Sequence, residues 1–390
     1  MRVLHLGRFW HGKSGGIERH AALLCKGLAA SGVDVVNLVA AKNVHSQDFM
    51  VNGVRTIEVA SFGVALSTAI APLLPFKALQ LHREKPFDIV HLHLPDPLSH
   101  AAALLLPKSV KRVITWHSDI IRQKTALQMY APFLNRLVNS ADAVVAATQA
   151  HFDSSTQISP SLPLNRRHVI AYGLDYSALR LTERTTALRD DLRAQAQGRG
   201  MVFALGRHVY YKGFDVLINA LEHTSAFLIL GGDGPLRPQL QQQVSALGLQ
   251  DRVHFAGLIP EADLAAYFRT CDVFCLPSVE QSEAFGLVQL EAMACAKPVV
   301  NTQLNNGVNV VMLDGVTGLT VPVGDAPAMA TAIHRLMVDT NLRKQLGGQA
   351  QERAYAEFSL AASVQKHVAL YEGLLAKAQK AATANVNKQI

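Results

Sequence analysis

Two glutamates flank a short glycine-containing turn in the second half of the chain. Glu283 and Glu291 stand eight positions apart, and the residues around Glu291 are strong helix formers. A helix over residues 285–296 would place Gly286 in its first turn, where backbone N–H groups lack partners and attract phosphate. Glu291 would lie about 7–8 Å further along the axis, because each residue adds about 1.5 Å. Carboxylates at this spacing suit hydroxyl groups at the two ends of a sugar diphosphate, whereas two solvated glutamates on a surface helix are the simpler alternative.

Two cations, Arg207 and Lys212, follow an apolar run that we expect to form a strand. A guanidinium and an ammonium here could bind two phosphates and stabilise the negative charge that builds on a departing nucleoside diphosphate. On their own, two such residues are more often solvated surface groups. The chain contains no Asp-x-Asp sequence, so a diphosphate bridged by a metal ion is not expected, and we assign no metal ligands.

The first half of the chain offers a glycine pair and several histidines. Gly15 and Gly16 follow the first expected strand and would let the backbone approach a substrate closely. They do not complete the G-x-G-x-x-G pattern of dinucleotide-binding proteins, which argues against a nicotinamide enzyme. His117 ends an apolar strand where a loop should open, although a core histidine bonded to the backbone is the alternative. His91 and His93 alternate along another strand, and packing is favoured over metal binding there.

Apolar runs alternate with helical patterns twice along the 390 residues, which predicts an α/β protein with two doubly wound, Rossmann-like parallel sheets. A chain of this length is also too long for one ordinary core. We expect a first domain at 1–175 and a second at 176–358, joined by a hinge near 172–200. The expected strands are at 3–9, 33–41, 89–94, 112–117, 143–148, 201–205, 227–230, 253–256, 273–276 and 298–301. The expected helices are at 17–30, 97–106, 127–139, 214–221, 236–247, 261–271 and 285–296.

Composition and charge narrow the class of protein. Hydrophobic residues make up 49% of the chain and charged residues 17%, as in a well-buried globular protein. The N-terminus lacks the pattern of a secretory signal, and polar residues and prolines interrupt the longest apolar run at 62–76. We therefore expect a cytoplasmic protein without a transmembrane segment. The four cysteines are expected to be buried thiols.

The net charge of +7 belongs to the first half of the chain. Residues 1–180 contain 19 Lys and Arg against 11 Asp and Glu, whereas residues 181–390 contain 18 against 19. No nucleic-acid motif accompanies this charge, so nucleic acid is not an expected partner. The balance predicts attraction to an anionic membrane surface or to a phosphate-bearing acceptor, although solvated surface charge would give the same count.

Five short motifs occur in an order that resembles the retaining glycosyltransferases of family 4, which share the two-domain GT-B fold. The first is E-x7-E from Glu283, followed by a small-residue helix, Lys297-Pro298-Val299-Val300 and the G-x-T-G-L sequence at 315–319. The others are Gly15-Gly16-Ile17-Glu18, Thr115-Trp116-His117-Ser118-Asp119, Gly206-Arg207 with Lys212-Gly213, and Gly-Gly-Asp-Gly-Pro-Leu at 231–236. The resemblance covers nearly the whole chain. The resemblance implies two domains facing across a cleft, a helix at 359–380 that returns to the first domain, and a frayed tail at 381–390.

The resemblance also implies roles for individual residues, with a nucleotide sugar as the donor and no cofactor. The diphosphate would be bound by Arg207 and Lys212, the sugar hydroxyls by Glu283 and the ribose by Glu291. His117 would contact the donor sugar. The expected donor-binding residues are Gly15, Gly16, Arg207, Lys212, Glu283, Phe285, Gly286, Leu287 and Glu291, and the expected catalytic residues are Glu283, Arg207, Lys212 and His117.

The longer string His-Ser-Asp-Ile-Ile-Arg-Gln-Lys at 117–124 resembles a bacterial subgroup that builds mannose- or rhamnose-containing surface polysaccharides. It implies that Asp119, Arg122 and Lys124 bind a lipid-linked glycan acceptor. The expected function is metal-independent, retaining transfer of a hexose, mannose from GDP-mannose, at the inner face of the plasma membrane. Alternative donors are GDP-rhamnose and UDP-hexoses. The alternative functions are a UDP-sugar 2-epimerase of the same fold and a non-catalytic sugar-nucleotide-binding protein.

Overall fold

The computed structural model describes residues 1–390 except 11–15, 67, 121–123 and 387–390, and it describes no side chains at 124–126 and 381–386. Contacts divide the chain into two compact units. The first unit comprises Met1–Gly173 together with Leu360–Ile390, and the second comprises Leu174–Ser359. The sequence placed these divisions after residues 175 and 358. The helix expected at 359–380 belongs to the first unit, although it extends beyond its expected end.

The first unit is built on an eight-stranded sheet in the order β10-β9-β8-β7-β1-β2-β4-β3. Neighbouring strands are parallel except at the edge, where β3 runs antiparallel to β4. This edge hairpin makes the first sheet mixed, whereas the sequence predicted an all-parallel sheet. The strands are β1 Arg2–Phe9, β2 Asp34–Ala40, β3 Gln47–Val51, β4 Val54–Val59, β7 Ile89–Leu94, β8 Lys111–Trp116, β9 Ala143–Ala146 and β10 Arg167–Val169, with a separate hairpin of β5 Val64–Ala65 and β6 Thr68–Ala69.

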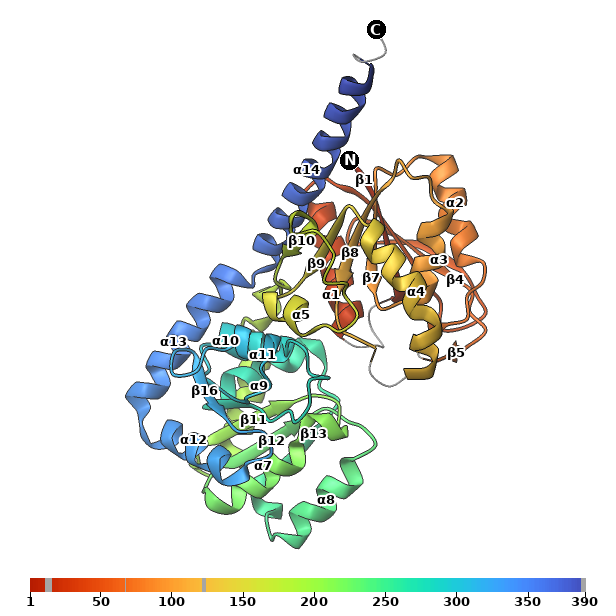
Figure 1. The fold of residues 1–390 in the computed structure, drawn as a ribbon. Helices are drawn as coiled ribbons and strands as arrows, with labels where there is room; N and C mark the ends of the chain where they lie inside the picture. Colours follow the sequence, from red (N-terminus) through yellow and green to blue (C-terminus); the bar gives the residue numbers. More distant parts are fainter. Residues whose placement is uncertain (11–15, 67, 121–123, 387–390) are drawn as a thin grey trace. The chain divides into compact units, whose positions relative to one another are not determined.

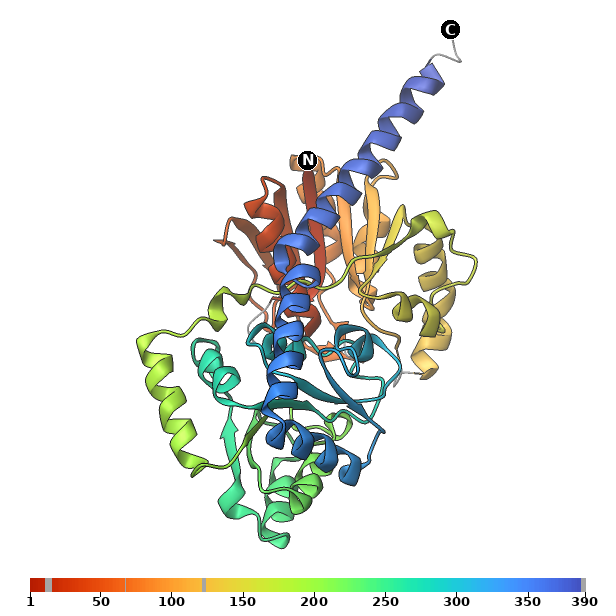
Figure 2. The same cartoon turned by 90° about the vertical axis from the view of Figure 1, so that its left-hand side faces the viewer.

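Helices cover both faces of this sheet (Figures 1 and 2). One face is aliphatic and packs against α2 Leu74–Glu84, α3 Pro97–Leu105 and α4 Lys124–Ser140. The other face packs against α1 Gly16–Ala30 and the long α14 Leu360–Val386, and it is apolar near the amino ends of the strands. Further along β1, β7 and β8 this second face carries buried polar residues instead. The two faces of one sheet therefore bury different chemistry.

The second unit contains a six-stranded parallel sheet in the order β13-β12-β11-β14-β15-β16. In chain order this is the doubly wound 3-2-1-4-5-6 arrangement, and its direction reverses between β11 and β14. Loops that follow these two strands at their carboxyl ends flank the position where such sheets bind ligands. The strands are β11 Met201–Leu205, β12 Phe227–Gly231, β13 Val253–Gly257, β14 Val273–Leu276, β15 Val299–Thr302 and β16 Gly318–Val321. The helices are α6 Glu183–Gln195, α7 Phe214–Ala220, α8 Arg237–Ala246, α9 Leu264–Thr270, α10 Leu287–Ala294, α11 Gly307–Val311, α12 Ala326–Val338 and α13 Thr340–Glu357, while the first unit also has α5 Gln149–Ser154.

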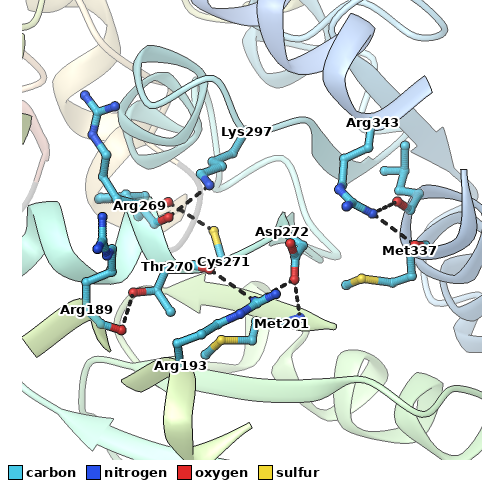
Figure 3. Close-up of polar contacts among 12 residues, drawn as sticks. Arg189, Arg193, Met201, Arg269, Thr270, Cys271, Asp272, Lys297, Met337 and Arg343 are labelled. Carbon is cyan, nitrogen blue, oxygen red and sulfur yellow. Dashed lines mark hydrogen bonds and ion pairs between the residues drawn. The ribbon is translucent and has the colours of Figure 1, made fainter. Parts of the chain in front are cut away.

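At the opposite, amino edge of this sheet, charged side chains satisfy the polar groups of the fold (Figure 3). The Asp272 carboxylate accepts a hydrogen bond from the backbone N–H of Met201, at the start of β11, and another from Arg193, both at 2.8 Å. Arg343 donates to two carbonyls in the last turn of α12, at 2.8 and 3.0 Å. Cations favour this end of a helix because the last carbonyls lack partners within it.

Several expected boundaries differ from the observed ones by a few residues. The helix expected at 285–296 begins at Leu287, because Gly286 has the left-handed conformation (φ 69°), and it ends at Ala294, before Ala296, which has φ 57°. The long helix α14 continues through the first residues of the expected tail, to Val386. Among the helices that the structure describes, none combines the length and apolar character that crossing a bilayer requires.

Candidate active site

The loops after β11 and β14 are held together by backbone contact. Gly213 has a left-handed conformation (φ 63°), and a Cβ atom built on it would lie 2.1 Å from the carbonyl oxygen of Pro277. The backbone N–H of Val279 also donates to the Tyr211 carbonyl at 2.8 Å. Only glycine permits both this φ and this approach. Gly213, directly after Lys212, therefore allows the backbones of the two loops to come into contact.

Lys212 and Glu283 meet where these loops join. The Lys212 ammonium forms an ion pair with the Glu283 carboxylate, and the two side chains are only 12% and 13% exposed. Ser278 lies within hydrogen-bonding distance of the same carboxylate at 3.4 Å, and the Asn306 side chain donates to the Glu283 carbonyl at 2.9 Å. A buried pair of this kind keeps both charges in place. A phosphate could replace Glu283 as the partner of Lys212. A sugar hydroxyl could replace Lys212 as the partner of Glu283.

Arg207 follows β11 directly after Gly206 and is exposed. Within the described part of the chain its guanidinium makes no hydrogen bond or ion pair. Its planar donors match the oxygens of a phosphate group. The structure thus places one unpaired and one paired cation in the loop after β11, and diphosphate binding by these residues remains a prediction.

The N-terminus of α10 has the features of an anion site. Gly286 precedes the helix, and no side chain caps it, so the first-turn N–H groups keep their donor capacity. A Cβ atom at Gly286 would lie 2.7 Å from the Leu276 side chain, which leaves room only for glycine. The buried Gln289 side chain donates to the Phe285 carbonyl at 3.0 Å and fixes the turn. The Phe285 and Gly286 carbonyls both accept hydrogen bonds from Gln289, and donor binding at this turn remains a prediction.

Glu291 lies on α10 and is buried. Burial and, secondly, the Glu291 carboxylate raise the pKa of Tyr176. The Tyr176 hydroxyl donates to the Phe358 carbonyl at 3.1 Å. Glu291 is therefore part of a tightly packed polar region and is not a solvated surface glutamate, which removes the simpler alternative for this residue.

In the first unit, His117 is buried and both of its ring nitrogens are engaged. Nε2 is hydrogen-bonded to Nδ1 of His93 at 3.0 Å, and Nδ1 to the Tyr172 hydroxyl at 2.7 Å. Burial, followed by the neighbouring His93, holds the pKa of His117 well below its ordinary value, so the ring is neutral. In this arrangement the imidazole has no nitrogen left for a sugar hydroxyl. The predicted direct contact with a donor sugar requires one of these bonds to open.

The remaining predicted residues of the first unit are only partly described. Asp119 accepts hydrogen bonds from Trp116 and from two residues of a neighbouring loop, Ser155 at 2.6 Å and the backbone of Thr156 at 2.8 Å. These bonds give the Asp119 carboxylate a structural role in addition to the predicted binding of a glycan acceptor. Gly16 begins α1, and Lys124 begins α4. Gly15, Arg122 and the Lys124 side chain lie outside the described residues.

Sequence reasoning missed Ser278, Gln289 and Asn306, which position the predicted residues. Ser278 and Gln289 are fully buried, and Asn306 caps the short helix α11 with its side chain. An asparagine directly before a helical segment is a recognisable capping signal. Ser278 and Gln289 match no recognisable motif, although their partners include the nearby Glu283 side chain and Phe285 carbonyl.

Family models match both halves of the chain. The model described as Glycosyltransferase Family 4 matches residues 14–178, and the model described as Glycosyl transferases group 1 matches residues 190–353. The first match spans the glycine pair and His117. The second contains both candidate loops and α10.

Curated relatives and solved structures agree with these matches. The D-rhamnosyltransferase WbpZ of Pseudomonas aeruginosa is 31% identical, over 90% of this chain and 91% of that protein. O-antigen chain mannosyltransferase C of Escherichia coli is 26% identical, over 96% and 99% of the two chains. Sucrose-phosphate synthase from Thermosynechococcus elongatus has a similar fold, with a TM-score of 0.80 at 23% identity over 96% of this chain and 99% of that one. HepE of Anabaena, solved with UDP and glucose, gives a TM-score of 0.75 at 23% identity over 95% and 99%. The chain therefore belongs to the family 4 glycosyltransferases and has their GT-B fold.

Proposed function

We propose that this glycosyltransferase moves a hexose from a nucleotide sugar to a hydroxyl of a lipid-linked glycan, with retention of configuration. One observation carries the proposal. The Lys212–Glu283 pair and the uncapped start of α10 both follow strands at the reversal point of the second sheet. This arrangement offers a cation, a carboxylate and free N–H groups to one diphosphate sugar.

The proposed reaction uses each of these groups. Arg207 and Lys212 hold the diphosphate and stabilise its growing charge while the bond between the sugar C1 and the phosphate oxygen breaks. Glu283, released from Lys212, accepts hydrogen bonds from the sugar hydroxyls. The acceptor oxygen bonds to C1 on the face that the phosphate leaves, and its proton passes to the departing phosphate oxygen. No metal ion takes part in these steps.

Mannose from GDP-mannose is the proposed donor sugar, and bacterial surface polysaccharide is the proposed product. The names of two similar proteins, a D-rhamnosyltransferase and an O-antigen mannosyltransferase, support this class of product. GDP-rhamnose and UDP-hexoses are the alternative donors.

A panel of nucleotide sugars, scored by the rise in melting temperature, tests this proposal, because a ligand stabilises the folded state in proportion to its affinity and concentration. GDP-mannose is expected to give the largest rise, and Lys212→Ala is expected to reduce it. A larger rise with a UDP sugar would replace the proposed donor. Transfer to a lipid-linked acceptor, followed by anomeric analysis of the product, checks retention.

We also propose that the first unit docks peripherally on an anionic membrane. Several large apolar side chains are exposed after β4, among them Phe62 (68%), Leu66 (68%) and Leu73 (60%), and so is Phe76 (63%) in the first turn of α2. Exposed apolar groups of this size in one segment commonly mark an interaction surface. The surplus of basic residues in the first 180 positions would add attraction to acidic lipids.

Liposome flotation at low ionic strength tests membrane docking. The protein is expected to float with anionic vesicles and not with neutral ones, and the double variant Phe62→Ser/Phe76→Ser is expected to stay in solution. Leu164→Ser is the matched control, because Leu164 is also exposed in the first unit but lies in a different segment. Equal flotation with neutral and anionic vesicles would contradict the electrostatic part of this proposal.

A further inference from the structure

Three histidines gather on the face of the first sheet that α1 and α14 cover. His5 lies on β1, and His91 and His93 lie on the adjacent strand β7. His5 is the register partner of His91, and alternation along a strand puts His93 on the same face as His91. All three side chains are buried. The fold therefore concentrates three imidazoles from two strands inside one core.

The ring nitrogens of these residues have the spacing of metal ligands. One nitrogen from each ring lies within 4.8 Å of the others. Nδ1 of His5 and Nε2 of His93 are 3.2 Å apart. In a tetrahedral zinc site with Zn–N bonds of about 2.0–2.1 Å, two ligand nitrogens are roughly 3.3 Å apart. One pair already has this spacing, and the third nitrogen lies within 4.8 Å of it, so one ion would have to draw the His91 ring closer.

The outer nitrogens of two of these rings have hydrogen-bond partners. Nδ1 of His93 is hydrogen-bonded to His117, and Nε2 of His91 to the Thr115 hydroxyl at 2.6 Å. The inner nitrogens are paired as well, Nε2 of His93 with His5 and Nδ1 of His91 with the Tyr371 hydroxyl, so an ion would replace these two hydrogen bonds. Outer hydrogen bonds of this kind orient histidine ligands in metal sites.

The surroundings of these rings are buried and polar. Nε2 of His5, which points away from the proposed ion, is buried and has no hydrogen-bond partner among the described residues. The hydroxyl of Tyr371, on α14, is hydrogen-bonded to Nδ1 of His91 and stands beside the remaining coordination position.

We propose that His5, His91 and His93 bind one Zn²⁺ ion in the core of the first unit, with the fourth position next to Tyr371. Three imidazoles are a known zinc ligand set, and nitrogen donors favour zinc over magnesium or calcium. The ion would join β1 to β7 on the face that α14 covers, so its role is to stabilise this part of the sheet. The proposal rests on the histidine geometry and is independent of the transfer reaction.

Metal analysis of the full chain, purified without a histidine tag, tests the proposal. One equivalent of zinc per chain is expected, either retained on purification or taken up from a stoichiometric titration, together with a rise in melting temperature. Replacement by Co²⁺ is expected to give the visible absorption of a tetrahedral site. A chain that neither retains nor takes up one equivalent overturns the proposal and leaves the three rings as a neutral hydrogen-bonded cluster.

Matched variants separate this site from other histidines. His93→Gln is expected to weaken zinc binding by more than the roughly 10–100-fold that loss of an outer hydrogen bond costs. His168→Gln on β10 is the control and is expected to bind zinc as the wild type does, whereas equal binding by both variants overturns the assignment. If His93→Gln does not fold, X-ray absorption of the zinc-loaded wild type decides, because fewer than three imidazole ligands would contradict the proposed set.

Discussion

The two edges of the second sheet both hold an ion pair, but they differ in how many of their other polar groups have partners. At the amino edge, Asp272 and Arg193 are bonded to each other, and Asp272 also satisfies a backbone N–H of the sheet. At the carboxyl edge, Arg207 has no partner within the described part of the chain, and α10 begins without a side-chain cap. An edge that only supports the fold can satisfy all its polar groups. An edge that binds an anion must leave donors open, which costs stability until the ligand arrives.

The strongest test of this contrast removes the paired cation at the carboxyl edge. Lys212→Ala is expected to lower kcat by on the order of 10²-fold or more, because the leaving diphosphate loses a cation. Initial rates at saturating donor measure the effect. Lys344→Ala is the control, since Lys344 is exposed on α13 of the same unit, and its kcat is expected to be unchanged. An unaltered kcat in Lys212→Ala would mean that Lys212 serves only to neutralise Glu283.

A second test concerns the buried carboxylate on α10. Glu291→Gln keeps the size of the side chain but removes its charge, so binding of GDP is expected to weaken by about 1.5–3 kcal/mol, or roughly 10–150-fold. Isothermal calorimetry with wild type and variant measures this difference. Glu352→Gln, on the exposed side of α13, is the control. Equal affinities for GDP would remove the ribose contact from the proposal.

The amino edge predicts the reverse outcome. Asp272→Ala is expected to lower the free energy of unfolding by about 1.5–3 kcal/mol, because the Met201 N–H and Arg193 lose a charged acceptor. The KM for the donor is expected to stay the same. Urea denaturation and steady-state kinetics measure the two quantities. Asp190→Ala is the control, because its ion pair is solvent-exposed and is expected to contribute no more than about 0.5 kcal/mol. A changed KM in Asp272→Ala would contradict the prediction that the amino edge affects stability but not donor binding.

The smallest expected effect is that of divalent ions on the transfer reaction. If Arg207, Lys212 and the start of α10 provide the positive charge, the rate is expected to be the same in excess EDTA and after addition of Mg²⁺ or Mn²⁺. Brief exposure to EDTA keeps the measurement separate from the proposed zinc ion, which lies among buried side chains. Activity that disappears in EDTA and returns with Mg²⁺ would show that the carboxyl edge needs a metal ion.

Strands buried on both faces were predictable because they form continuous apolar runs. The expected ranges coincide with β7, β11 and β14. The edge strand β3 was missed because most of its side chains are exposed and give no such run. The helix α2 was missed because its first turn lies at the end of the proline-interrupted apolar stretch at 62–76, which was considered only as a membrane segment.

The sequence allowed the candidate residues of the site to be singled out, but it did not predict the contacts between them. Lys212 and Glu283 were both singled out, yet their ion pair depends on the approach of Gly213 to Pro277, which joins loops far apart in the sequence. His5 was not singled out at all. It stands alone in β1, and only the pairing of β1 with β7 brings it to the other two histidines.

The contact at Gly213 has a consequence for transplanting donor specificity between relatives. Because the loop that carries Lys212 touches the loop that carries Glu283 through backbone atoms as well as through the ion pair, neither can be exchanged without regard to the other. A grafted loop with any side chain at position 213 would separate the lysine from the glutamate even if both residues were retained. Residues 207–213 and 277–283 therefore form a single cassette, and chimeras should inherit them from the same parent.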